Sequence, residues 1–223
     1  MLDTIVRFFQ EGGPFMYPIA IVLALGLAIT LERFFYLSAV RRRNRIAFEQ
    51  GILPLLRKRD YQRAMKAATN SDSAIASIMG AGIGRLLSNS RREDIEYAME
   101  EGLMEVLPRL EKRTQYLATL ANIATLLGLL GTIIGLIAAF TAVAAADPSQ
   151  KASLLSESIS VAMNTTAFGL MSAIPLLMFH AVLQTRTNEI VDSFEMAGVK
   201  LLNMVSDSGS TPVAGSAARP SAA

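Results

Sequence analysis

The fold is decided by YLATLANIATLLGLLGTIIGLIAAFTAVAAA, residues 116–146, which contains no charged side chain. A helix of ~20 apolar residues crosses the ~30 Å hydrocarbon core of a bilayer, so this stretch is long enough to span one. Gly128, Gly131 and Gly135 share one face of such a helix. Because small residues let helix backbones approach closely within a membrane, we predict that these glycines pack against another helix.

Two further stretches have the composition of membrane spans. Residues 14–38 hold a run free of charge up to Leu31, and residues 158–185 contain no Asp, Glu, Lys or Arg. A hydrophobic content of 52% is also typical of membrane proteins. We therefore predict an all-α membrane protein with three transmembrane helices that extend into a cytoplasmic helical domain.

The charges outside these stretches predict the orientation. Four arginines lie between residues 41 and 45, whereas residues 1–11 hold one Arg and two acids. Lys and Arg are enriched on the cytoplasmic side, so we place the N-terminus in the periplasm and the C-terminus in the cytoplasm. The predicted segments are an amphipathic N-terminal segment 1–13, spans 14–38, 116–146 and 158–185, a cytoplasmic helical loop 39–115, a periplasmic loop 147–157, a cytoplasmic amphipathic helix 186–205 and a disordered tail 206–223.

The cytoplasmic loop carries helix signals of its own. Asp60 is a candidate N-cap for a short helix, and Ser90, with Glu93 at the capping-box position, is a candidate N-cap for a later one. We predict that the later helix continues into the second span, with a kink at Pro108. Its apolar stripe consists of Ile95, Ala98, Met99, Leu103, Val106 and Leu110.

Several functional classes find no support in the composition. The chain has no cysteine and one histidine, His180, which argues against thiolate or histidine metal centres and histidine-dependent triads. No phosphate-binding loop or nucleophile elbow is present, and a net charge of +2 does not indicate a nucleic-acid partner. We expect neither an enzyme nor a bound metal or cofactor. We interpret His180 as an interfacial side chain in preference to a proton relay.

Polar side chains accompany the small residues of the second and third spans. Such hydroxyls can bond to helix carbonyls or join helices, or they can line a hydrated path for an ion, and both readings stay open. The candidate path residues are Thr125, Thr132, Asn164, Thr165, Thr166 and Ser172, and the candidate packing residues are Gly128, Gly131, Gly135 and Gly169.

The apolar part of each span lacks Asp and Glu. A hydroxyl does not titrate in the useful range, so a proton-driven machine generally needs a membrane carboxyl as the proton carrier. Either this protein moves no protons, or another chain supplies the carboxylate.

Three motifs resemble those of the TolQ/ExbB/MotA proton-channel family. They are GGPFMYPIAIVLALGLAITLERFFYL from Gly12, GLLGTIIGLIAAF from Gly128 and TTAFGLMSAIP from Thr165. The resemblance covers about residues 10–200 and is nearer to the TolQ/ExbB branch. It implies a homo-oligomeric ring, a pentamer, in a bacterial inner membrane. It also implies a single-span TolR/ExbD/MotB-like partner whose membrane Asp carries the proton, so that proton flow rotates the ring and delivers force to an envelope component.

Carried over by position, the family's two pore threonines fall on Thr132 and Thr166. ExbB-like members often carry a Glu where this chain has Val161, and Glu157 lies one turn earlier. This departure favours a divergent branch that serves gliding motility, protein transport or other envelope work. Separately, the hydroxyl-only polar row favours protons over sodium as the transported ion. Anionic lipid is an expected contact of the arginine cluster 41–45. The alternatives are a passive oligomeric scaffold without ion conduction and, less favoured, a small transporter.

Overall fold

The computed structural model describes residue 9, residues 12–88 and residues 90–209, and this part of the chain is helical throughout, with short turns and no strand. It divides into two compact units. The first comprises residues 1–37 and 111–187, and the second comprises residues 38–110 and 188–223. Residues 206–209 of the predicted disordered tail instead belong to a helix that ends at Gly209. The rest of that tail, 210–223, and most of the predicted N-terminal segment 1–13 lie outside the described residues.

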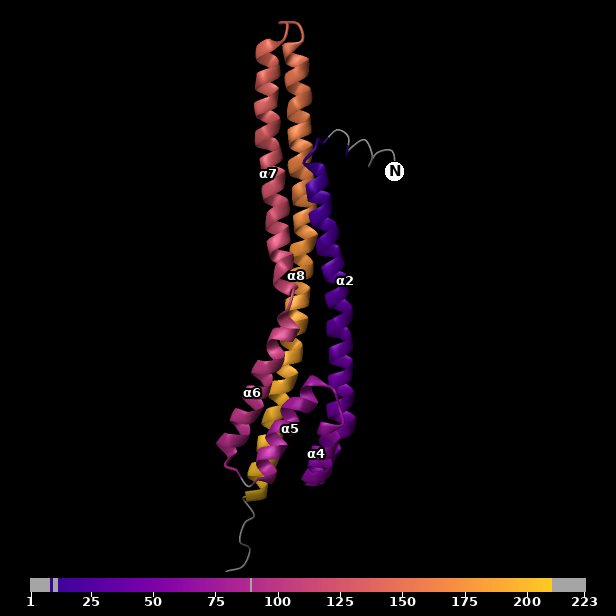
Figure 1. Ribbon diagram of the computed structural model, residues 1–223, viewed down its shortest axis with the longest axis vertical. Helices are drawn as coiled ribbons and strands as arrows, with labels where there is room; N and C mark the ends of the chain where they lie inside the picture. The colour runs from indigo at the N-terminus through magenta and orange to yellow at the C-terminus, as the bar shows by residue number, and fades with distance from the viewer. Residues whose placement is uncertain (1–8, 10–11, 89, 210–223) are drawn as a thin grey trace, which may run out of the picture. The chain divides into compact units, whose positions relative to one another are not determined.

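Three long helices form the first unit (Figure 1). They are α2 (Met16–Ile46), α7 (Thr114–Ala145) and α8 (Lys151–Gly209), and the ends of α2 and α8 belong to the second unit. All three are long and apolar enough to cross a membrane. The prediction of an all-helical chain with three such helices is therefore confirmed, while the ring and the cytoplasmic position of the second unit stay predictions.

Small residues on one helix and large ones on the next hold the first unit together. Gly26 of α2 lies against the side chain of Leu176 of α8, which is fully buried. Pro175 lies inside α8, which continues past it to Gly209. The apolar side chains buried in this unit include Met16, Ile19, Leu37, Leu117, Ala121, Ala124, Leu176 and Leu183.

The second unit is built from shorter helices around the ends of α2 and α8. Asp60 accepts a hydrogen bond from the backbone N–H of Arg63 over 3.1 Å, which confirms it as the N-cap of α4. The buried core includes Phe48, Ile52, Leu56, Ile75, Met79, Ile83, Ile95, Phe194 and Leu201. The elements are η1 (Ala47–Ile52, a π-helix), α3 (Leu53–Arg57), α4 (Tyr61–Thr69), α5 (Ala74–Leu87) and α6 (Arg92–Glu111).

The predicted cap at Ser90 is wrong. Helix α6 begins at Arg92, and Asp94 accepts a hydrogen bond from the backbone N–H of Arg91 over 3.0 Å. The hydroxyl of Ser90 lies 3.1 Å from that of Ser88 instead. The side-chain-to-backbone bond of the capping box is therefore shifted by one residue from the prediction. Asp94 takes the place of Glu93, and the backbone N–H of Arg91 takes the place of that of Ser90.

The predicted continuity from α6 into the second span is also wrong. Pro108 lies inside α6, and the interruption falls four residues later, between the end of α6 at Glu111 and the start of α7 at Thr114. Arg113 occupies the left-handed region with φ of 67°, which a helix does not tolerate. A proline costs one backbone hydrogen bond, whereas a residue with positive φ ends the helix.

Candidate functional site

Helices α7 and α8 approach most closely where two glycines face each other. A Cβ added to Gly169 would lie 2.8 Å from the carbonyl oxygen of Ala124 and 3.0 Å from the Cα of Gly128. A Cβ on Gly135 would lie 3.0 Å from that of Ala162. The glycine face of α7 thus lies directly against the backbone of α8, and we call this contact the glycine seam.

Thr166 joins the two helices within the glycine seam. Its hydroxyl donates a 2.9 Å hydrogen bond to the main-chain carbonyl of Gly128. In an α-helix that carbonyl also accepts the backbone N–H of Thr132, so the second lone pair serves Thr166. The two threonines that the family resemblance singled out therefore converge on one carbonyl group.

Thr165 connects the seam to the chain that leads into α2. Its buried hydroxyl lies 2.6 Å from the carbonyl oxygen of Gly12 and 2.9 Å from that of Val161, and it donates its single hydrogen to this pair. Its methyl group occupies the place where a side chain on Gly131 would lie. A glycine at 131 is thus required for Thr165 to reach Gly12.

Ser172 and Asn164 occupy different environments. Ser172 is fully buried, and its hydroxyl has no hydrogen-bond partner within the described residues. A buried hydroxyl without a partner costs about 1–3 kcal/mol unless water reaches it. Asn164 is half-buried on α8, one position before Thr165.

Thr125 and Thr132 are not enclosed by the seam. Thr125 donates to the carbonyl of Ala121 over 3.1 Å and Thr132 to that of Leu129 over 2.6 Å, both within α7. Seven residues separate them, so they share one helix face. Within a single chain this face forms a polar row on the side of α7 that α8 does not cover completely.

A charge pair that the sequence analysis missed lies at the other end of the first unit. Arg113 donates to Glu32 over 2.6 Å, although 81 residues separate them, and both side chains are about half exposed. The guanidinium of the neighbouring Arg33 lies 4.6 Å from the ring centre of Tyr36, and Arg33 is buried. The signal available in the sequence was that Arg113 is the last charge before the apolar run that begins at Thr114.

Val161 lines a cavity of about 250 Å³ beside the seam. The cavity lies between the turn before α2 and helices α7 and α8, and its lining includes Gly13, Ile134, Ala138 and Ser158. Among the described residues no carboxylate lines it, and Glu157 is exposed. The described residues of the seam and its cavity therefore offer hydroxyls and carbonyls, and they include no acid.

The described residues bring together no group of three or more His, Cys, Asp or Glu that could hold a metal ion. His180 is half-buried on α8, and its Nδ1 has no partner among the described residues. The site is therefore built from glycines, threonines and backbone carbonyls. Such a site can orient water through its hydroxyls and carbonyls.

Comparisons with known proteins identify the family of the chain. A model of the MotA/TolQ/ExbB proton channel family matches residues 70–196, which is more than half of the chain. A protein of Methanothermobacter thermautotrophicus, named as an ExbB homolog and provisionally assigned to biopolymer transport, is 26% identical over 86% of this chain and 67% of its own length. An ExbB-like protein of Synechocystis sp., provisionally assigned to the same role, is 28% identical over 79% of this chain and 83% of its own length.

Proposed function

Because the chain belongs to the MotA/TolQ/ExbB proton channel family, we propose that it is the channel-forming subunit of a motor driven by the proton-motive force. In this proposal it forms a homo-oligomeric ring, a pentamer, in an inner membrane, with its N-terminus in the periplasm. It carries out ion transport and no enzymatic reaction.

The proposal rests on the side chains described at the glycine seam, none of which is an acid. Thr165 and Thr166 are held at fixed positions by bonds to Gly12 and Gly128, and neither titrates near neutral pH. A carboxyl that crosses the membrane beside them must therefore come from a second protein. We propose a single-span TolR/ExbD/MotB-like partner whose membrane Asp lies within the ring.

The polar row of Thr125 and Thr132 supports the same arrangement. Hydroxyls on an incompletely covered face of a membrane helix are poorly placed toward lipid. In the ring they face the partner and provide the path on which its Asp exchanges a proton with water. Each proton that falls through ~100 mV releases ~2.3 kcal/mol, which can bias one step of rotation.

The energised process is an envelope process. The ExbB-related names of the similar proteins point to transport of a biopolymer, and Val161 in place of an acid leaves room for a divergent task such as gliding motility. The identity of the partner decides between these tasks.

The test is to extract the tagged chain from its native membranes in a gentle detergent and to measure subunit masses and ratios by native mass spectrometry. We expect a ring of this chain that holds fewer copies of a single-span protein with a membrane Asp. The purified complex, reconstituted in vesicles, should then acidify the lumen under an imposed potential. A ring that lacks such a companion and conducts no protons would favour the passive scaffold.

A further inference from the structure

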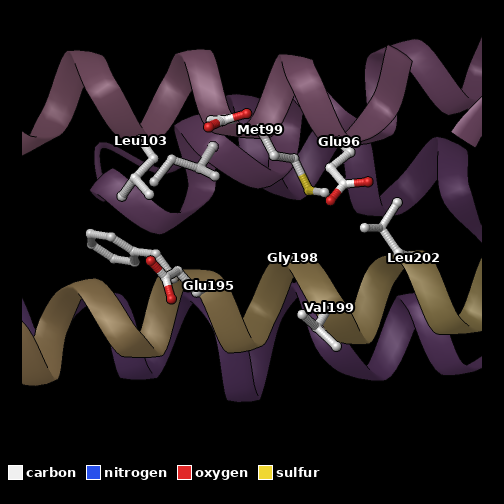
Figure 2. A pocket seen from close by; sticks show the side chains of 10 residues that line it. Glu96, Met99, Leu103, Glu195, Gly198, Val199 and Leu202 are labelled. Atoms are coloured by element: carbon white, nitrogen blue, oxygen red, sulfur yellow. The ribbon is translucent and has the colours of Figure 1, made fainter. Parts of the chain in front are cut away.

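A groove with an apolar floor and acidic margins lies between α6 and α8 in the second unit (Figure 2). Its volume is about 270 Å³, and its floor includes Met99, Phe194 and Leu202, all of which are buried. Val199 at its edge is 55% exposed. Figure 2 shows Glu96 on the α6 side and Glu195 on the α8 side of this space.

Three carboxylates surround the groove without a counter-charge. Glu96, Glu100 and Glu195 line it, and none of them forms an ion pair with any described residue. Glu96 and Glu100 are one turn apart on α6, where like charges destabilise a helix. In an isolated chain, the exposed apolar surface and the repulsion between the acids both raise the free energy of the folded state. A partner that offers an apolar side chain flanked by cations would relieve both.

The end of α2 carries a patch with the opposite properties. Ile46 is 46% exposed, and Arg42 and Arg43 lie one turn before it on the same helix face. The two arginines are exposed and form no ion pair within the described part of the chain. Asn44, which is buried, marks the inner face of the helix, and Ile46 lies about 200° around the helix from it.

Ile46 lies level with the end of the groove that holds Phe194 and Glu195 in the second unit. Arg41 of α2 forms an ion pair of 2.7 Å with Glu189 of α8, and farther along both helices Lys200 lies 5.8 Å from the ring centre of Phe48. The two helices are therefore parallel here. Ile46 follows Arg41 by about 7.5 Å and Glu195 follows Glu189 by about 9 Å, at 1.5 Å per residue.

We propose that the acidic groove of one chain receives Ile46, Arg42 and Arg43 of a second copy of the same chain. Chains related by rotation about the membrane normal present like surfaces at like heights, so the groove and the patch meet when copies stand side by side. The contact joins different surfaces, and such a contact generates a ring when the rotation between neighbouring copies closes. This inference rests on the ring of the proposed function and adds the surface that joins its subunits.

A cysteine pair tests the contact directly, because the native chain has no cysteine. Ile46→Cys and Val199→Cys are combined in one chain and treated in native membranes with a short bifunctional maleimide. We expect a ladder of covalent multimers from the double variant and only monomers from each single variant. As a matched control, Ile46→Cys is paired with Leu87→Cys, an exposed residue of α5 outside the groove, and should give no ladder.

Charge reversal tests the same contact without a reagent. Glu96→Arg with Glu100→Arg places like charges across the contact and should lower the oligomer fraction in native mass spectra by roughly tenfold. Arg42→Glu with Arg43→Glu should do the same, and the four changes together should restore the oligomer. The restoring effect should weaken at high salt.

The outcomes separate this inference from the proposed function. An intact ring in the mass spectra without a ladder from the double variant overturns the inference and leaves the channel proposal standing. Dimers from Ile46→Cys alone indicate a twofold contact and also overturn it. A ladder together with absent proton flux supports the contact and counts against the channel.

Discussion

The hydroxyl of Thr166 on α8 donates a hydrogen bond of 2.9 Å to the main-chain carbonyl of Gly128 on α7. The donor is a side chain and the acceptor is backbone, so a change at position 166 alters the bond while the acceptor stays in place. This asymmetry makes the contact suitable for separating a structural role from a role in conduction.

Thr166→Val keeps the shape of the side chain and removes its hydroxyl. We expect the ring to assemble, with a loss of about 0.6–2 kcal/mol in stability, and proton flux to be abolished. Thr185→Val is the matched control, since Thr185 on the same helix bonds only to its own turn, at Ala181. Proton flux in vesicles and melting in detergent are measured for both, and equal flux in the two variants would contradict the assigned role.

Gly169→Ala should separate α7 from α8. The added Cβ would lie 2.8 Å from the carbonyl oxygen of Ala124, a backbone atom that cannot rotate away, so we expect a loss of about 1–3 kcal/mol in stability. Gly84→Ala in α5 is the control, because its nearest neighbour lies 3.9 Å away. That change should stabilise the helix by about 0.5–1 kcal/mol. Thermal melting of the two variants should shift in opposite directions.

Arg59→Gly should stabilise the second unit. Arg59 has φ of 58° at the end of α3, and the backbone N–H groups of Arg59 and Asp60 donate to the carbonyls of Leu56 and Leu55. This is the Schellman arrangement, in which glycine is preferred at the left-handed position. We expect a gain of about 0.5–1 kcal/mol from relieved backbone strain. Arg57→Gly, inside the same helix, should be destabilising in the same denaturation assay.

Asp94→Ala should loosen the start of α6, and Ser90→Ala should not. Asp94 holds the backbone N–H of Arg91, whereas the hydroxyl of Ser90 contacts only that of Ser88 in this region. Loss of a helix cap costs about 0.5–2 kcal/mol. Amide hydrogen exchange over the first turn of α6 measures the effect. Faster exchange in Ser90→Ala would indicate that Ser90 caps α6, as the sequence predicted.

The parts of the fold that could be predicted from sequence depend on local rules. The charge-free run at residues 116–146 and the cap at Asp60 follow from length, composition and spacing within one turn. The cap of α6 was placed one residue early because Ser90 and Glu93 satisfy the same spacing as Arg91 and Asp94. Two registers of one motif differ only in which acid bonds to the backbone, and spacing does not decide that.

The contacts between distant residues could not be predicted in the same way. The partner of Glu32 is Arg113 rather than a neighbour in sequence, and the partner of Thr165 is a carbonyl near the N-terminus. Both contacts depend on which helix faces pack together. The sequence of one helix does not determine how the neighbouring helix is rotated about its own axis. The exposed row of Thr125 and Thr132 was foreseeable as a row, but its incomplete coverage by α8 was not.

The bond from Thr165 to the carbonyl of Gly12 has a consequence for biogenesis. Translation makes the carbonyl first and the hydroxyl 153 residues later, an interval of about 8–30 s at ~5–20 residues per second. During that time the turn before the first span lacks its hydrogen bond from Thr165, and the carbonyl of Gly12 remains accessible to water or to a chaperone. A chain that stops after the second span lacks Thr165, so in such a chain the carbonyl of Gly12 never receives this hydrogen bond.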